Sequence, residues 1–339
     1  MRFEFYHSGL ENIPKLSVDG TVSNSVHLSH WNGNETPAAV KADTSTEIAL
    51  NVVALPNIDA ITQGIQLVTN NHFDTDGVLS VWTMLNGDGA LSLRDKLIPA
   101  AEAGDFSEFT NESAIRASIA IQGSDQPVTA DDSGSPLARK LAGGPVDDDA
   151  RAYELVLPEV ERVLTRTGDY EELWRDPWQQ IEKAIESLEK RASHVEEFDQ
   201  ARFSLVVISS EVFGKDGFDP SQHAAPFTAV SRYSQGELFV IAIPYLDGWA
   251  YRLDYPYYSW AETIVRPRIE RRNLKNAVSE LGRIESDVRG KWTLDSSELS
   301  SAAKFTGADG KLACSSLRPE QVAAVISASA VLSEAAASH

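Results

Sequence analysis

The residues with the clearest capacity for chemistry lie between positions 67 and 82, in the stretch LVTNNHFDTDGVLSVW. His72, Asp74 and Asp76 alternate there, and Gly77 follows them. Hard divalent cations prefer carboxylate oxygens, and imidazole is a common ligand of manganese, iron and zinc. A bound cation would remove the repulsion between the two aspartates. The pattern therefore predicts a metal site, with His72 and Asp76 as candidate catalytic residues.

Apolar stretches on both sides place this motif between a strand and a helix. Residues 65–71 are rich in Ile, Leu, Val and Thr, which is typical of a short strand. Residues 77–87 repeat apolar side chains at helical spacing. A strand, a polar loop and a helix form the βα unit of a parallel sheet, and ligands bind at the carboxyl edge of such sheets. A simple loop, in which an aspartate caps the helix, is the alternative.

The segment HFDTDG after an apolar strand resembles the first motif of the DHH phosphoesterases. The resemblance implies an N-terminal parallel α/β domain that binds Mn²⁺ or Mg²⁺, and a smaller C-terminal α/β domain that closes over the substrate. It implies that His72, Asp74 and Asp76 are metal ligands and that Asp125 completes the site. The Asp-His-His motif of that superfamily is absent from this chain, which would therefore be a divergent member.

A second polar cluster precedes the motif, in the segment VHLSHWNGNETPAAVKADTSTE. We expect His30 to supply a further metal ligand, and His27 and Lys41 to contact an anionic substrate. The residues DTSTE predict a helix N-terminus, whose free amides attract phosphate. Two alternatives stay open: a surface loop whose histidines pair with carboxylates, or a different hydrolase in which His27 and His30 are the principal metal ligands.

Aromatic residues and arginines alternate in the segment YRLDYPYYSWAETIVRPRIERR. Aromatic rings can stack on a base, and arginine can hold phosphate through two parallel hydrogen bonds. We expect Arg252, Arg266 and Arg268 to bind substrate, with His223 reaching it from a loop. The alternative is that the tyrosines belong to strands and that the arginines pair with nearby glutamates.

The length of 339 residues suits two domains. We expect an α/β fold: residues 1–150 form a parallel-sheet domain with helices on both faces, residues 151–200 a helical linker, and residues 201–339 a smaller mixed α/β domain. The strand candidates of that last domain are residues 202–213, 227–233, 237–246 and 250–256. Helices are expected near 260–288 and from Pro319 onward.

Composition narrows the choice of partners. The net charge is −20, from 50 acidic and 30 basic residues, which disfavours binding of duplex nucleic acid over a broad surface. A single cysteine, Cys314, excludes an intramolecular disulfide and a cysteine-rich zinc site. The N-terminus does not resemble a signal peptide, and the apolar runs are too short to span a bilayer. We therefore expect a cytoplasmic protein without membrane contact, and a homodimer stays open.

These features together predict a metal-dependent, phosphoesterase-like hydrolase. Its substrate would be a small phosphate ester, a nucleotide or a short oligonucleotide. The alternative is a non-catalytic protein of the same fold that binds a nucleotide or another anion.

Overall fold

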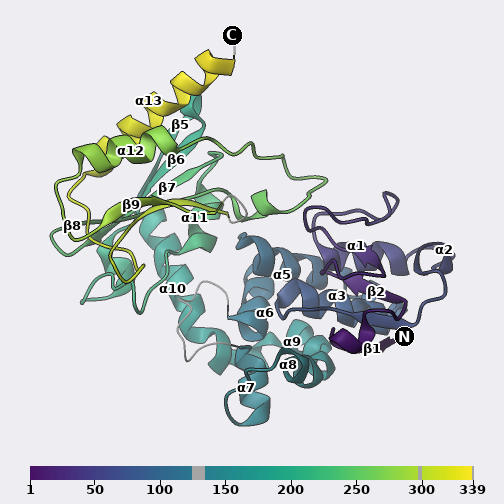
Figure 1. The fold of residues 1–339 in the computed structure, drawn as a ribbon. Helices are drawn as coiled ribbons and strands as arrows, with labels where there is room; N and C mark the ends of the chain where they lie inside the picture. Colours follow the sequence, from purple (N-terminus) through teal and green to yellow (C-terminus); the bar gives the residue numbers. More distant parts are fainter. Residues whose placement is uncertain (124–133, 297–299, 338–339) are drawn as a thin grey trace. The chain divides into compact units, whose positions relative to one another are not determined.

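The chain forms two compact units in the computed structural model, which describes residues 1–123, 134–296 and 300–337. The first unit comprises Met1–Trp178 together with Trp260–Pro267, and the second comprises Gln179–Ser259 and Arg268–His339. The predicted α/β fold is confirmed, with a parallel sheet in the first unit and a mixed sheet in the second (Figure 1). None of the described helices has the length and apolar character needed to cross a membrane.

The first unit is built on a parallel sheet with the strand order β1-β4-β2-β3. Its strands are β1 (Arg2–Phe3), β2 (Lys15–Val18), β3 (Ser25–Leu28) and β4 (Leu67–Thr69). The strand predicted over residues 65–71 is confirmed in β4. Because all four strands run in the same direction, the chain leaves each of them at the same edge of the sheet.

Helices follow the strands of the first unit and cover the sheet. The helix α3 packs against β1, β2 and β4, while α1 packs against α3 and β3. The helix predicted over 77–87 is confirmed in α3, which begins two residues earlier because the Asp74 side chain caps it. The helices are α1 (Ser45–Val53), α2 (Asp59–Thr62), α3 (Thr75–Asn86), α4 (Asp88–Leu91), α5 (Arg94–Phe106), α6 (Glu112–Gln122), α7 (Pro136–Ala142), α8 (Asp149–Val156) and α9 (Val160–Thr165). The helix α10 (Glu171–Glu189) begins in this unit and ends in the second.

The second unit contains a mixed sheet with the order β5-β6-β7-β8-β10-β9, in which β6 and β7 are parallel. Alternate strand residues face opposite sides, so Tyr251 and Phe305 lie in one buried cluster with α12 and α13, and Ile241 in another with α11. The strands are β5 (His194–Phe198), β6 (Phe203–Val207), β7 (Phe239–Tyr245), β8 (Gly248–Asp254), β9 (Lys291–Leu294) and β10 (Ser301–Thr306). The helices are α11 (Phe227–Tyr233), α12 (Lys275–Ile284) and α13 (Pro319–Ala337).

Short 3-10 turns connect several of these elements. They are η1 (Ser8–Leu10), η2 (Leu157–Glu159), η3 (Thr167–Tyr170), η4 (Asp199–Ala201), η5 (Ser210–Phe213) and η6 (Tyr257–Trp260).

Three local predictions were wrong. Residues 227–233, expected as a strand, form the helix α11, because a short apolar run does not distinguish a buried strand from a buried helix. The helix expected over 260–288 is limited to α12, and Val288, at the end of the expected helix, is 97% exposed. The end of the helical segment expected over 151–200 is the strand β5, and the rest of that segment falls on both sides of the division between the units.

The lysine of β2, Lys15, is a buried cation tied to the main chain. Its Nζ donates to the carbonyl oxygens of Leu10 at 2.9 Å, Ile13 at 3.1 Å, Asn24 at 3.2 Å and Glu11 at 3.3 Å. Burying a charge is costly unless hydrogen bonds compensate it, and the four carbonyls supply that compensation. Lys15 therefore joins the turn before β2 to the start of β3.

We predict that Lys15→Met destabilises the protein by about 2–4 kcal/mol, because methionine fills similar space but leaves buried carbonyls without a donor. Urea denaturation followed by tryptophan fluorescence measures the change. Lys140→Met, at an exposed position of α7, serves as the control and should change stability by less than about 0.5 kcal/mol. Equal effects of the two substitutions would contradict this role of Lys15.

Candidate metal centre

Acidic and imidazole side chains gather where three neighbouring strands of the first unit end. Asp19 directly follows β2, His30 lies two residues after β3, and residues 72–76 follow β4. Asp19 adopts a left-handed backbone conformation with φ of 59°, which aspartate tolerates better than most residues. The site therefore occupies the carboxyl edge of a parallel sheet, where open α/β folds bind ligands.

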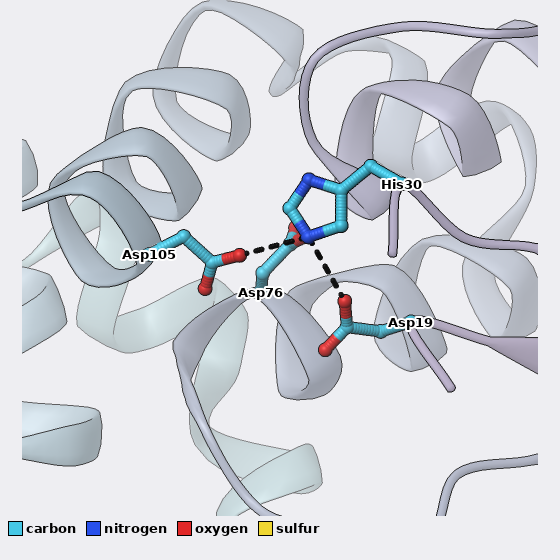
Figure 2. Close-up of side chains that lie close together, drawn as sticks. All are labelled: Asp19, His30, Asp76 and Asp105. Atoms are coloured by element: carbon cyan, nitrogen blue, oxygen red, sulfur yellow. Dashed lines mark ion pairs between the residues drawn. The ribbon is translucent and has the colours of Figure 1, made fainter. Parts of the chain in front are cut away.

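The first set of side chains, the inner group, consists of Asp19, His30, Asp76 and Asp105 (Figure 2). Three carboxylates converge on Nε2 of His30: Asp105 Oδ2 at 3.0 Å, Asp19 Oδ1 at 3.5 Å and Asp76 Oδ2 at 3.7 Å. The side chains of Asp19 and His30 are fully buried, and that of Asp105 is 4% exposed. One imidazole and three carboxylates within this distance could hold a metal ion.

The second set, the outer group, consists of Asp19, His72 and Asp74. Nε2 of His72 lies 2.9 Å from Asp19 Oδ2 and 3.0 Å from Asp74 Oδ2. Asp19 is shared, because one of its oxygens faces the inner group and the other faces the outer group. The side chains of His72 and Asp74 are 25% and 20% exposed, so solvent reaches the outer group.

Asp76 is held by the N-terminus of α1. Its two carboxylate oxygens accept the backbone N–H groups of Ser45 at 2.6 Å and Thr46 at 2.7 Å. The helix N-terminus predicted around Thr44 is confirmed, but its first amides bind this carboxylate of the protein itself. The helix therefore fixes Asp76 and lowers the cost of burying its charge.

Asp105 reaches the inner group because α5 approaches α3 closely. Gly104 faces Thr75, and a Cβ at position 104 would lie 2.6 Å from the Thr75 Cβ and 3.1 Å from the Ser118 hydroxyl oxygen. Real side chains do not approach that closely, so only glycine allows this spacing. The contact places Asp105 beside Asp76, which is adjacent to Thr75 in α3.

The orientation of His30 suits a metal ligand. Its Nδ1 lies 2.5 Å from the carbonyl oxygen of Asp43, which can only accept, so Nδ1 carries a proton. Nε2 then points at the acids, yet among the described residues neither Nε2 nor Asp105 Oδ2 has a hydrogen-bond partner of acceptable geometry. A histidine that donates one ring N–H to a carbonyl and directs the other nitrogen into an acidic site is the usual arrangement around a bound metal.

The electrostatics of the cluster favour a positive charge at its centre. Burial lowers the pKa of His30, but Asp105 and Asp19 outweigh it and raise that pKa well above its usual range. Burial and the charge of Asp19 raise the pKa of Asp76 to about 7. Against the effect of burial, Asp74 and Asp19 raise the pKa of His72 to about 11. The cluster thus retains protons that a divalent cation could replace, and its donor set fits such an ion.

The other predicted site residues of the first unit lie elsewhere or are engaged. His27 accepts the Glu35 N–H at 3.1 Å and lines a surface hollow of about 650 Å³ apart from the acidic cluster. Residues i and i+3 of an extended chain face opposite sides, so the structure separates His27 from His30. Lys41 pairs with Glu262 at 3.0 Å, and Arg266 is surrounded by acids. Asp125 lies outside the described residues.

The remaining candidates belong to the second unit. Arg252 donates to the buried Asp254 through Nε at 2.5 Å and Nη2 at 2.6 Å. His223 accepts the Asp219 N–H at 3.0 Å, and Arg268 is exposed.

The sequence analysis did not identify Asp19 and Asp105. Asp19 offered a signal, because it directly follows the short strand KLSV, as the His72 motif follows β4 closely. Asp105 offered a weaker one, the three-residue spacing of acids at 102, 105 and 108, which also occurs on solvent-exposed helices.

A model of the family DUF6687, a family of unknown function, matches residues 2–335. The chain belongs to DUF6687. The matched range covers all but the terminal residues of the two compact units of this DUF6687 protein, and it contains every residue of the inner and outer groups. No curated protein matches the chain.

We predict that Gly104→Ala destabilises the protein by about 1–3 kcal/mol, because the added methyl group forces α5 away from α3. Gly89→Ala is the matched control, since it also replaces a helical glycine but nothing lies within 4 Å of its Cβ position. The control should be neutral or stabilising by up to about 1 kcal/mol. Thermal denaturation of the two variants measures the difference, and a Gly104→Ala protein as stable as the wild type would refute the close contact.

Proposed function

We propose that this protein is a metal-dependent, phosphoesterase-like hydrolase that uses Mn²⁺ or Mg²⁺. The observation that carries the proposal is the shared carboxylate of Asp19, which directs one oxygen to each of two groups that could hold a metal ion. Two neighbouring ions joined by a carboxylate are the usual arrangement of two-metal phosphoesterases. The resemblance of the HFDTDG segment to the DHH phosphoesterases supports the same reaction class.

Each ligand has a defined role in this proposal. His30, Asp76 and Asp105 would hold the inner ion, His72 and Asp74 would hold the outer ion, and Asp19 would contribute one carboxylate oxygen to each group. Bound ions would supply a water of lowered pKa and would neutralise charge on the phosphoryl group. The partly exposed outer group is where substrate would meet the centre.

The substrate that fits best is a small phosphate ester, a nucleotide or a short oligonucleotide. A chain of net charge −20 repels long polyanions, so the metal ions would have to provide the attraction for phosphate. The second candidate function, anion binding without turnover, is favoured by the absence of the Asp-His-His motif from the chain. Lys41 and Arg266 are paired with acids and offer no free positive charge to the anion, so another group would have to bind it. Nucleotide-induced thermal stabilisation without release of phosphate would distinguish it.

We predict that Mn²⁺ raises the melting temperature of the EDTA-treated protein. Ions at about 100 times their dissociation constant would stabilise the native state by about 2.7 kcal/mol. Binding must displace the proton of Asp76, whose pKa is about 7, so affinity should rise between about pH 6 and about pH 8.

Asp105→Asn preserves size but removes one negative ligand, and should abolish most of this rise in melting temperature. The exposed Asp88→Asn protein is the control and should respond as the wild type does. Differential scanning fluorimetry measures the shifts, and an equal response of Asp105→Asn and wild type would exclude Asp105 as a ligand.

We predict Mn²⁺-dependent hydrolysis of bis(p-nitrophenyl) phosphate, reduced about 100-fold or more in Asp19→Asn, since the bridging carboxylate serves both ions. Release of p-nitrophenol measures the rate, and Asp88→Asn should retain it. The proposal fails if the purified protein binds no divalent ion, or if Asp19→Asn turns over as fast as the wild type.

A further inference from the structure

One segment of the chain, Trp260–Pro267, belongs to the first unit although the chain enters it from the second unit and returns there. We name it the crossing segment. It packs on the loop that carries His30: the Glu262 N–H donates to the His30 carbonyl at 2.7 Å, and Ala261 forms a β-bridge with Trp31. The Trp260 ring meets the His30 ring edge-on, with centroids 5.0 Å apart.

The crossing segment also fixes the hydrogen-bond partner of His30. The carboxylate of Asp43 accepts the backbone N–H groups of Ile264, Val265 at 2.8 Å and Arg266 at 3.1 Å, and the Arg266 Nη1 at 2.8 Å. The carbonyl of the same residue accepts His30 Nδ1–H. Asp43 therefore connects the crossing segment directly to the imidazole of the inner group.

Arg266 extends this connection to the opposite side of the inner group. Its Nε and Nη2 donate to Glu108 at 2.9 Å and 2.5 Å, and Nη2 also lies 2.9 Å from Glu102. These two glutamates lie three residues before and after Asp105. The guanidinium also stacks on Phe106, 4.7 Å from the ring centroid, and its side chain is only 15% exposed.

We propose that Arg266 is a positioning residue that holds His30 and Asp105 at the spacing required to bind the inner cation. It acts on His30 through Asp43 and on Asp105 through Glu102 and Glu108, and it touches neither ligand itself. This proposal rests on the proposed function. It adds a residue outside the inner and outer groups that controls affinity for the inner ion. A planar guanidinium can satisfy three carboxylates from fixed directions, whereas a lysine ammonium cannot reproduce that geometry.

Arg266 should affect the two ions unequally. Loss of Arg266 should weaken the inner site and leave the outer site nearly intact, because no Arg266 contact reaches His72 or Asp74 among the interactions of the described residues. By analogy with other residues that orient ligands, affinity for one ion should fall about 10–100-fold. A general loss of stability would instead affect both ions.

The test compares Arg266→Ala, Arg266→Lys and the control Arg162→Ala, which removes an exposed arginine paired with Asp169 at 2.9 Å. Calorimetric titration with Mn²⁺ gives the number and affinity of the ions. We expect one weakened ion in Arg266→Ala, partial recovery in Arg266→Lys, and two unchanged ions in the control. If Arg266→Ala does not fold, Glu108→Gln replaces it, because this substitution removes the charge of one carboxylate that Arg266 contacts. The same titration is then made on Glu108→Gln.

A second readout works on the metal-free protein. The His30 Nδ1–H, bonded to the Asp43 carbonyl, should give a slowly exchanging signal in spectra of ¹⁵N-histidine-labelled protein, assigned by its loss in His30→Gln. Arg266→Ala should accelerate its exchange, and Arg162→Ala should not. Unchanged exchange together with unchanged Mn²⁺ affinity in folded Arg266→Ala would overturn the inference. A wild-type protein that binds no Mn²⁺ would refute the proposed function. The exchange rate of the His30 Nδ1–H in Arg266→Ala would then be the measurement that tests whether Arg266 positions His30.

Discussion

The structure of the first unit depends on one electrostatic constraint, the crowding of carboxylates around the buried imidazole of His30. Asp19, Asp76 and Asp105 bring more negative charge than one imidazole can balance, in a place from which solvent is excluded. Such a cluster persists only if protons or a cation neutralise it and if the surrounding scaffold compensates each acid. Several hydrogen bonds from neighbouring residues to these carboxylates reduce the cost of burying their charge.

Asp76, Asp19 and Asp74 each have a different form of support. Asp76 accepts two amides of α1, Asp19 accepts the Ser45 hydroxyl at 2.8 Å, and Asp74 accepts the Gly77 N–H at 2.7 Å. Asp74 is therefore both a helix cap, through Oδ1, and a neighbour of His72, through Oδ2. The two interpretations of the Asp-x-Asp-Gly sequence, a capped loop and a ligand set, are compatible, because a carboxylate has two oxygens that can serve different partners.

The sequence predicted the parts of this site that local patterns encode. The strand β4, the loop with His72, Asp74 and Asp76, and the helix α3 are contiguous, so periodicity and capping residues identify them. Asp19 and Asp105 join them only through the pairing of β2 with β4 and the packing of α5 on α3, and no local pattern records those contacts. The crossing segment was wrongly included in the helix expected over 260–288 for the same reason. Its partner Asp43 lies more than 200 residues away in sequence, so no local pattern could predict the hydrogen bonds between them.

The inner and outer groups differ in solvent exposure, so the ions that they would hold should behave differently. The inner group is enclosed, and its ligands are fixed by α1, by α5 and by the crossing segment, so an ion there would exchange slowly and would stabilise the fold. The outer group is partly open and depends mainly on the loop after β4, so an ion there could change its ligands as substrate arrives. Asp19 belongs to both groups. The contacts that hold the inner group would therefore oppose a movement of Asp19 when the outer ligands shift. With ions bound, an anionic substrate approaching this acidic protein would meet the more accessible cation first.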